Sequence, residues 1–399
     1  MSRPWRRAWF GERLRYIAPA LGPRSVRRLG SLALALVALV ACSRAEPPGG
    51  GAGDDVAPPA SVSWSASRGS SSPSSAPPPA SAPAASSAPR VSSAPAEPLP
   101  RDDGRPQHVE SVDELLKLFT VRSFTEKEIK MRGDPKMFLD KNFGVGTPSR
   151  INQGNKELAH HDKSRAECLA GLEGITIQTE EQRAICGAPN MVPIKRGKGR
   201  PKTCIDVFEF PNQPCEIPFV WIAPTQASAL CELVGKRLCN QEEWINACRG
   251  DPEGGKDSMY AYGEELDLTA CNTNKPARSY GGTVCDPDSA RSAWNTCGTN
   301  TEPSGSFPRC RSRMGVFDLH GNVAEIMTRY DPDGHTYSQL KGSAFFYVDV
   351  ARKHDERAKE GRETYPDHCG HDPRWHVERM DAAWHVNYHL GFRCCKTVR

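Results

Sequence analysis

Two carboxylates in one short segment, residues 314–327, have the chemistry of a cation site. Asp318 and Glu325 flank a glycine turn at Gly321, where we expect backbone carbonyls without regular pairing. Calcium takes about six to eight oxygen ligands from carboxylates and carbonyls, so the segment predicts a calcium site. The same residues also fit a helix start, because Asn322 is followed three positions later by Glu325, which is close to a capping box. On local evidence alone the helix start is the stronger interpretation.

A second group of chemically capable side chains lies near the C-terminal end of the sequence. It combines one cysteine, Cys369, with five histidines, which are His368, His371, His376, His385 and His389. Imidazole and thiolate together bind copper, iron or zinc, and His368, His371 and His376 are candidate ligands beside Cys369. The spacing of His385 and His389 would place both on one face of a helix or a strand. Unligated core and surface histidines are the competing interpretation, and the pattern alone favours it.

The cysteines indicate an exported, cross-linked domain. Fourteen of the fifteen cysteines lie between Cys168 and Cys395, and no pair has the Cys-x-x-Cys spacing of a zinc ribbon. An even set at irregular spacing in an exported chain is typical of a disulfide framework with up to seven bridges. We expect the adjacent Cys394 and Cys395 to bond to different partners. The spacing does not predict the connectivity.

The net charge argues against a nucleic-acid ligand. The whole sequence carries +4, but residues 1–41 contain eight arginines and one glutamate, so the remaining residues carry −3. A mildly acidic chain lacks the basic surface that nucleic-acid binding needs. We therefore expect no nucleic-acid partner.

Residues 1–41 have the features of a signal peptide. Arginines precede an apolar run from Leu32 to Ala41, which is far shorter than the about 20 residues of a membrane-spanning helix. The run ends Leu39-Val-Ala-Cys42, which resembles the lipobox of bacterial lipoproteins. This resemblance implies a lipid on Cys42, a membrane anchor and a place in the bacterial cell envelope. Ser43 after the cysteine favours the outer membrane, and an ordinary signal peptide is the alternative.

Two further regions precede the patterned half of the sequence. Residues 42–105 are almost entirely Pro, Ala, Ser and Gly, and too few apolar side chains are present to offset the entropy cost of folding. We interpret them as a disordered tether. Residues 106–187 predict a small, mainly helical lead-in region, with helices near 111–119, 163–172 and 179–184.

Residues 188–399 predict short elements of mixed type. Apolar and alternating runs predict strands, and capping signals predict helices. The expected strands are 191–194, 204–210, 218–221, 237–239 and 344–350, together with a buried strand near Val316. The expected helices are 224–234 and 241–248, together with one that starts at Asn322. Residues 251–310 show almost no periodic pattern, so we expect this stretch to depend on cross-links or a metal.

Six sequence blocks in this half carry a family resemblance. They are Gly235-Lys-Arg-Leu-Cys239, Glu242-Glu-Trp244, Ala247-Cys-Arg-Gly250, Gly315–Glu325, Lys341-Gly-Ser343 and Leu390-Gly-Phe-Arg-Cys394. Together they resemble the sulfatase-modifying factor, or formylglycine-generating enzyme, family over about residues 188–399. The resemblance implies an α+β, C-type-lectin-like fold with little regular secondary structure, disulfide-rich in this chain, with structural calcium.

The resemblance also assigns calcium ligands. Asp318 and Glu325 would bind through their side chains, and Gly321 and Val323 through their backbone carbonyls. Asn272 would belong to a second calcium site. The family usually has asparagine where this sequence has Asp318, and both residues offer a suitable oxygen.

The catalytic residues of the family match less well. Active members hold copper with two cysteines, the first of which follows the Gly-Gly-Ser block closely. Here Gly342-Ser343 is followed by Ala-Phe-Phe-Tyr, and Cys369 is the one candidate for the second position. One free thiol cannot build a two-thiolate copper site, so copper or iron is not expected.

Three functions remain open. The first is a lipid-anchored, non-catalytic scaffold that binds a protein, a peptide or a glycan. The main alternative is a divergent metal-dependent oxidase that acts on a protein or a small thiol, with Cys369 as its catalytic residue. The third is a structural envelope protein that only occupies space on its tether.

Overall fold

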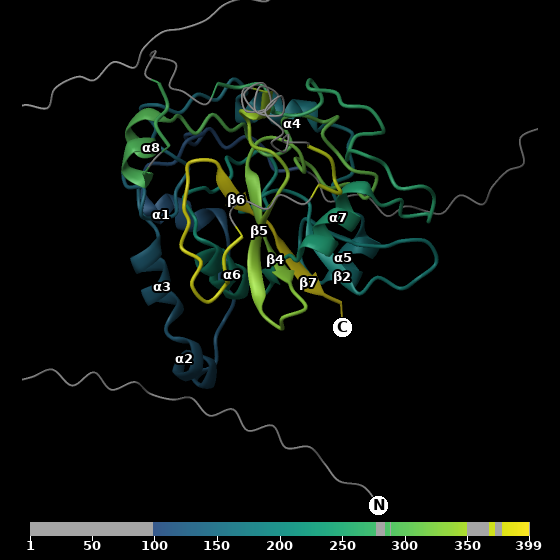
Figure 1. Cartoon of the computed structure of the whole chain (residues 1–399), viewed down its shortest axis with the longest axis horizontal. Coiled ribbons are helices and arrows are strands. Elements are labelled where there is room, and N and C mark those ends of the chain that lie inside the picture. Colours follow the sequence, from purple (N-terminus) through teal and green to yellow (C-terminus); the bar gives the residue numbers. More distant parts are fainter. Residues whose placement is uncertain (1–98, 277–283, 288, 349–366, 372–376, 399) are drawn as a thin grey trace, which may run out of the picture. The chain divides into compact units, whose positions relative to one another are not determined.

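The computed structural model describes residues 99–276, 284–287, 289–348, 367–371 and 377–398 (Figure 1). The expected signal peptide, Cys42 and most of the expected tether lie outside these residues. The described residues belong to one compact unit, Ser86–Arg399. None of the described helices is both long and apolar enough to cross a membrane.

The helices are short, and most begin at a side-chain cap. They are α1 (Val112–Leu115), η1 (Leu116–Leu118), α2 (Glu126–Arg132), α3 (Pro135–Asn142), α4 (Arg165–Gly171), α5 (Glu180–Cys186), α6 (Pro224–Leu233), α7 (Gln241–Arg249) and α8 (Ala290–Thr296). Capping boxes open α2, α4, α5 and α7. The three helices expected between residues 106 and 187 are confirmed as α1 with η1, α4 and α5, and the expected helices 224–234 and 241–248 are confirmed as α6 and α7.

The strands form two small sheets. They are β1 (Met191–Pro193), β2 (Thr203–Asp206), β3 (Arg237–Leu238), β4 (Ala324–Tyr330), β5 (Thr336–Lys341), β6 (Leu390–Phe392) and β7 (Cys394–Thr397). The first sheet has the order β1-β2-β7-β3 and is antiparallel. The second has the order β5-β4-β6, in which β4 and β6 run parallel. β6 and β7 are separated by Arg393 alone, so the chain passes directly from one sheet to the other.

The prediction of a helix that starts at Asn322 is wrong. Residues 324–330 form β4, which is the central strand of its sheet and pairs with both β5 and β6. Asn322 itself has φ +58° and is not a helix cap. Long-range strand pairing therefore overrides the local capping pattern, because apolar Ile326 and Met327 are buried by neighbours distant in sequence.

Two expected strands are also corrected. Residues 218–221 contribute one isolated bridge, between Val220 and Asn152. Residues 344–348 do not form a strand: residues 345–346 form a turn and residues 347–348 are helical. Their amides bond to loops, since Phe345 donates to Asn322 and Val348 donates to Thr273. The rest of the expected strand 344–350 lies outside the described residues. The strand in this part of the chain is β5, which ends at Lys341, before Gly342.

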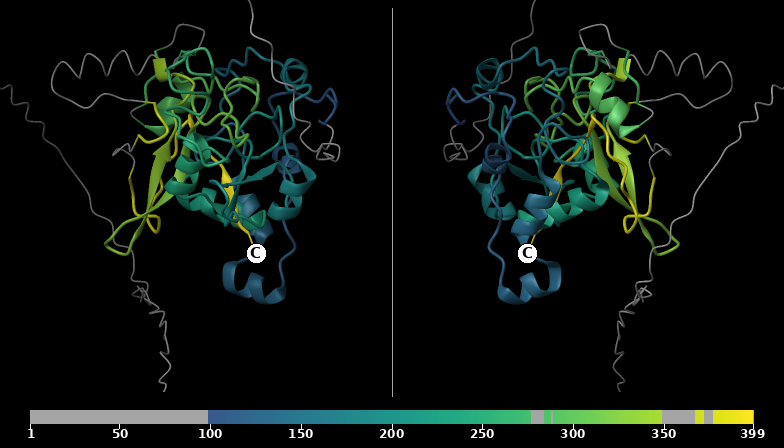
Figure 2. Two further views of the ribbon diagram at one scale, coloured as in Figure 1. Left: turned by 90° about the vertical axis from the view of Figure 1, so that its right-hand side faces the viewer. Right: turned by 90° about the vertical axis from the view of Figure 1, so that its left-hand side faces the viewer.

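The lead-in residues 106–187 pack into the same core as the residues that follow them. Phe119 and Phe143 lie at 5.3 and 5.8 Å, ring centre to ring centre, from Phe210 and Phe219 respectively. Arg165 of α4 forms a buried ion pair with Glu216. α1, α2 and α3 lie along one edge of the unit, where α2 projects and buries none of its residues (Figures 1 and 2).

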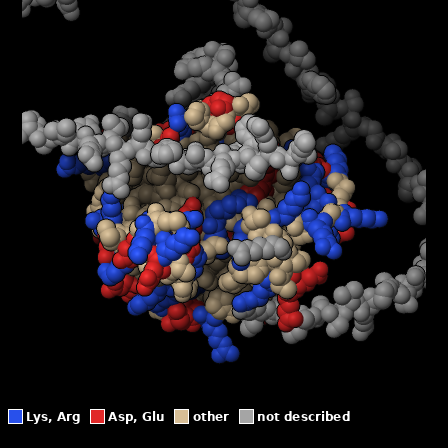
Figure 3. All heavy atoms as spheres, turned by 90° about the horizontal axis from the view of Figure 1, so that it is seen from below, with Lys and Arg blue, Asp and Glu red and all other residues tan. Residues whose placement is uncertain are grey.

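All fourteen described cysteines are paired. The disulfides join Cys168 to Cys215, Cys186 to Cys204, Cys231 to Cys394, Cys239 to Cys395, Cys248 to Cys369, Cys271 to Cys310 and Cys285 to Cys297. The disulfide-rich framework is therefore confirmed. The different partners expected for Cys394 and Cys395 are also confirmed. On the face seen in Figure 3, basic and acidic side chains are interspersed.

Candidate functional site

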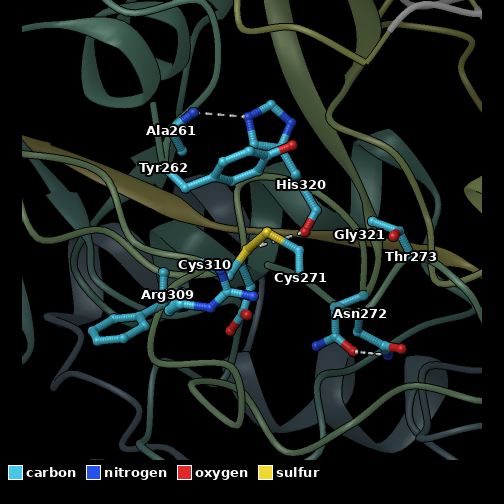
Figure 4. Close-up of a disulfide and its surroundings, with 12 residues drawn as sticks. Ala261, Tyr262, Cys271, Asn272, Thr273, Arg309, Cys310, His320 and Gly321 are labelled. Atoms are coloured by element: carbon cyan, nitrogen blue, oxygen red, sulfur yellow. Dashed lines mark hydrogen bonds between the residues drawn. A yellow bond between two sulfur atoms is a disulfide. The ribbon is translucent and has the colours of Figure 1, made fainter. Parts of the chain in front are cut away.

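The turn that precedes β4 brings the sequence-predicted residues together. Asp318, Gly321 and Asn322 have positive φ angles of 55°, 73° and 58°. A side chain at Gly321 would place its Cβ 2.2 Å from the backbone oxygen of Asn272, so only glycine fits there. Asn272 also holds the turn directly, since its carbonyl accepts a bond from the Asn322 amide at 2.8 Å. Figure 4 shows Asn272 and Gly321 on neighbouring segments of this site.

Glu325 leaves this turn as part of β4 and forms an ion pair with Arg393. The Arg393 Nε donates to Glu325 Oε2 at 2.7 Å, and its Nη2 donates to Oε1. The indole Nε1 of Trp244 donates to the same carboxylate at 3.0 Å. Both charged side chains are buried. Glu325 thus neutralises an arginine that would otherwise be a buried, unpaired charge.

Two more buried carboxyls surround this ion pair. Glu209 accepts bonds from the Ser304 hydroxyl at 2.8 Å and from the Asn322 side chain at 2.6 Å. Asp318 accepts a bond from the Gly305 amide at 2.6 Å. Burial raises the pKa of Asp318 to about 7, and the nearby charge of Glu325 adds to this rise. Burial also raises the pKa of Glu209, whereas the positive charge of Arg393 lowers it. Glu209, Asp318 and Glu325 thus share Arg393 as a nearby cation.

Calcium was predicted at Asp318, Gly321, Val323 and Glu325. One feature of the geometry favours a cation there and another opposes it. Three carboxyls with one buried arginine form a site that a further cation would balance. However, Glu325 already bonds to Arg393 and Trp244, so a calcium ion would have to share or replace these bonds. The Asn272 side-chain amide donates to Asn322 Oδ1 at 3.0 Å, which fixes that side chain on a protein partner. Calcium stays a prediction at both places.

Cys369 is not a free thiol, contrary to the oxidase alternative. It forms a disulfide with Cys248 of α7, and both cysteines are buried. The position after Gly342-Ser343 holds no cysteine either, because Ala344 and Phe345 occupy it. The residues present therefore do not fit a two-thiolate copper site.

His320 lies beside this disulfide. Its Nε2 lies 3.5 Å from the Cys248 sulfur. The same nitrogen accepts a bond from the Ala261 amide at 3.0 Å (Figure 4). The Nδ1 of His320 lies 3.1 Å from Asp367 Oδ1, and because Nε2 accepts from Ala261, Nδ1 is the nitrogen that donates to this carboxylate. The other oxygen of Asp367 accepts a bond from the Ser343 hydroxyl at 2.7 Å. The Gly321 amide in turn donates to that hydroxyl at 2.9 Å, which joins this chain of bonds to the turn.

Aromatic rings and a second disulfide enclose His320. The rings of Tyr260 and Tyr262 stack on each other and meet the imidazole edge-on, with centres 5.8 and 5.4 Å from it. The sulfur of Cys310, which bonds to Cys271, lies 3.4 Å from the backbone oxygen of His320 (Figure 4). Burial raises the pKa of Tyr262. The surroundings of the imidazole are thus largely apolar and rigidly cross-linked.

The histidines singled out in the sequence are not gathered around one ion. The rings of His368 and His371 lie 5.8 Å apart, but in the described part of the chain neither joins a group of three possible ligands. His376 lies outside the described residues. His389 packs its ring against Phe346 with centres 4.9 Å apart. Burial lowers the pKa of His385, which is typical of a neutral, packed imidazole.

Sequence reasoning missed the residues that define the site. Cys248, His320 and Asp367 stand on three segments and meet only in the fold. The even cysteine count gave one usable signal, because fourteen cysteines can pair fully only if Cys369 is among them, although the sequence left open whether Cys369 is free. His320 stood inside the most informative block, between Leu319 and Gly321, but nothing local distinguished it from a turn residue.

Comparisons with known proteins agree with the sequence blocks. The family model of the sulfatase-modifying factor enzyme 1-like domain matches residues 195–398. Two curated relatives carry the name inactive C-alpha-formylglycine-generating enzyme 2. The protein from Mus musculus is 27% identical over 188 residues, covering 47% of this chain and 51% of its own length. The protein from Bos taurus is 27% identical over 184 residues, covering 46% of this chain and 51% of its own.

The chain spans about half the length of the curated relatives it matches. Among solved structures, the crystal structure of CarF aligns with 16% identity and a TM-score of 0.28, covering 46% of this chain and 68% of that one. The matched residues 195–398 hold β4, β6, Cys369 and His320, so the family model spans the whole site described above. This chain therefore belongs to the family of the sulfatase-modifying factor enzyme 1-like domain.

Proposed function

We propose that this chain is a non-catalytic member of its family, anchored by a lipid on Cys42 in a bacterial cell envelope, where it binds a protein, peptide or glycan. One observation carries the absence of catalysis: Cys369 is bonded to Cys248. The copper chemistry that the family resemblance implies needs two thiolates, and this chain offers neither a second cysteine near Ser343 nor a free one at position 369. Both curated relatives are named inactive, which agrees with the proposal.

The framework supports a binding role. Its seven disulfides and capped short helices hold long irregular segments in place, and binding residues are commonly carried by loops on a rigid scaffold. Calcium at Asp318 and Glu325 would add to this scaffold as a structural ion. The outer membrane is the proposed location, since Ser43 follows the lipidation cysteine.

The first test counts thiols. The purified chain is denatured without reductant and its free thiols are alkylated and identified by mass spectrometry. We expect none among the fourteen cysteines from Cys168 to Cys395. A cysteine-containing peptide should also remain unoxidised in the presence of oxygen and copper. A free Cys369 together with peptide turnover would contradict the proposal and support the oxidase alternative.

The second test concerns the anchor. In a bacterial host, the full-length chain should incorporate labelled palmitate and partition into the detergent phase. The Cys42→Ser variant should lose both properties, and Cys285→Ser together with Cys297→Ser serves as a cysteine control that keeps them. Equal labelling of the Cys42→Ser variant would contradict lipidation at this residue.

A further inference from the structure

One buried cluster has no part in the proposed binding function. It consists of the Cys248–Cys369 disulfide and the ring of His320. The imidazole Nε2 lies 3.5 Å from the Cys248 sulfur and 3.8 Å from the Cys369 sulfur. The three possible ligand atoms all lie within 4.8 Å of one another, and all three side chains are buried. A single nitrogen atom thus faces both sulfur atoms of one disulfide.

The imidazole is oriented as in many metal sites. Its Nδ1 donates to Asp367, and Asp367 is itself held by the Ser343 hydroxyl. A histidine that binds a metal through one nitrogen usually donates a hydrogen bond from the other to a carboxylate, which fixes the ring and its tautomer. The lone pair of Nε2 at present accepts the Ala261 amide bond, and the same nitrogen lies within 3.8 Å of both sulfur atoms. A metal ion would replace this one bond.

The distances fit tetrahedral zinc. Zinc–sulfur bonds of about 2.3 Å and zinc–nitrogen bonds of about 2.0 Å place a sulfur and a nitrogen ligand about 3.6 Å apart. The observed separations of 3.5 and 3.8 Å are close to that value. The two sulfur atoms must separate to about 3.7 Å, which rotation of their side chains allows once the bond between them is broken. The position of His320 would need little change.

A second cysteine pair offers a matched comparison. Among the described residues, Cys239, Cys395 and Glu243 form the other group of three possible metal ligands. The carboxylate of this group already has a partner, because both oxygens of Glu243 accept hydrogen bonds from Arg237. Its cysteines also form a disulfide. This pair therefore has the same redox chemistry without a free third ligand.

We propose that Cys248, Cys369 and His320 form a redox-gated zinc site, which binds Zn²⁺ after a thiol reductant has opened the Cys248–Cys369 disulfide. Three protein ligands leave one position of the tetrahedron for water. The site differs from a copper pair downstream of Ser343, because Cys248 comes from α7. It is also independent of the proposed binding function, which concerns the oxidised chain.

The redox step balances without a further reactant. A thiolate of the reductant attacks one sulfur, forms a mixed disulfide and releases the other cysteine as a thiolate. A second reductant thiolate then attacks the reductant sulfur in that mixed disulfide and releases the second cysteine. The protein gains two electrons and the reductant becomes a disulfide. Zn²⁺ then takes the place of the two thiol protons, so binding releases protons to the solvent.

The experiment uses the full-length chain and Co²⁺ as a visible substitute for Zn²⁺. The folded protein is titrated with dithiothreitol, and absorbance from thiolate-to-cobalt charge transfer is recorded. We expect one Co²⁺ per chain, bound in step with the opening of the Cys248–Cys369 disulfide, and displacement of the ion by Zn²⁺. Without reductant we expect no such absorbance.

Alkylation locates the site without any substitution. Partly reduced protein is treated with iodoacetamide with and without Zn²⁺, and the modified cysteines are identified by mass spectrometry. We expect Zn²⁺ to protect Cys248 and Cys369 and to leave Cys239 and Cys395 unprotected. The variants Cys248→Ala with Cys369→Ala should lose the cobalt band, whereas Cys239→Ala with Cys395→Ala should keep it.

The Asp367→Asn variant tests the orientation of His320. Loss of such a carboxylate weakens metal affinity by about 10- to 100-fold, and we expect that decrease here with the oxidised fold unchanged by circular dichroism. The proposal is overturned if Zn²⁺ protects neither cysteine or protects both pairs equally. It is also overturned if Cys248–Cys369 stays closed until the chain unfolds. Neither result affects the test of catalysis, which counts thiols in the unreduced protein.

Discussion

Arg393 and Glu325 form a buried ion pair at the point where the chain crosses from β6 to β7. The two side chains are 0% and 1% exposed. The guanidinium also donates to the backbone oxygens of Asp206 at 3.1 Å and Phe317 at 2.9 Å. One arginine thus satisfies groups from β2, from β4 and from the segment before the site turn. The two sheets and the acidic cluster share this side chain.

Replacing Arg393 should therefore strongly lower the stability of the folded protein. Arg393→Met keeps much of the volume but leaves Glu325, Glu209 and Asp318 without a cation. We expect a loss of about 3–5 kcal/mol in the free energy of unfolding, the range observed when one partner of a buried pair is removed. Urea unfolding measures it. Lys136→Met removes the exposed ion pair with Asp140 and should change stability by less than about 1 kcal/mol. Equal losses would contradict this account.

Calcium should stabilise the wild-type chain if the prediction at Asp318 is correct. A ligand present at about 100 times its Kd adds about 2.7 kcal/mol to the free energy of unfolding, which raises Tm. Differential scanning calorimetry with calcium and with a chelator measures the shift. The Asp318→Ala variant should lose the response, and the exposed Asp140→Ala variant should retain it. If the chelator leaves the wild-type Tm unchanged, no calcium binds and the carboxyls are balanced by Arg393 and protons.

Phe143 should contribute to the stability of the whole unit, although it precedes the family domain. Its side chain is 0% exposed and its ring packs against Phe119 and Phe219. Phe143→Ala should cost about 3–5 kcal/mol because the cavity left behind cannot fully close. Met137→Ala, at a position 69% exposed on the preceding helix α3, should be nearly neutral. Two separate unfolding transitions, with only one of them shifted, would show that residues 106–187 fold apart from the rest.

The stacked His108 and His161 should make the protein sensitive to mild acid. Burial lowers the pKa of each ring from 6.5 to about 4. Between these values the unfolded chain binds more protons than the folded one, so stability falls as the pH falls from about 6.5 to about 4. Each ring contributes at most about 3 kcal/mol to this change.

The His161→Gln variant tests this pH dependence. Urea unfolding at several pH values should give a shallower loss of stability between pH 6.5 and pH 4 than in the wild type. His108→Gln should act in the same direction, since both rings are buried and the charge of one opposes protonation of the other. An unchanged slope in both variants would show that other groups govern acid unfolding.

Two copies of one sequence pattern show what could be predicted from sequence. Asn240-Gln-Glu-Glu243 forms the expected capping box at the start of α7, because its partners lie within three residues. Asn322-Val-Ala-Glu325 has the same end residues but enters a strand. There the Glu325 carboxylate bonds to Arg393, 68 positions away. Local capping was predictable for this reason, and the competition from a distant arginine was not.

The site was predictable in the same limited way. The turn at Gly321 was found from a sequence block, whereas Asn272 was named only from the family resemblance, as part of a separate calcium site. The structure places Asn272 against the turn. The disulfide partner of Cys369 was not found, because Cys248 lies 121 positions earlier and many pairings satisfy an even count. Asp367 carried no sequence signal, since it gains its role only by facing His320. Long-range contacts thus account for most of what was missed.

The position of β7 has a consequence for how the protein reaches its native state. β7 lies between β2 and β3, and its adjacent cysteines bond to Cys231 and Cys239 across 163 and 156 residues of sequence. A chain still lacking residues 394–397 cannot close the first sheet or form either bridge. Domains that depend on such distant contacts fold slowly, and correct disulfide pairing adds steps that take seconds to hours. The polypeptide must therefore remain unaggregated and open to oxidation until its last residues are available, so its yield should depend on the oxidising and chaperoning capacity of the compartment in which it folds.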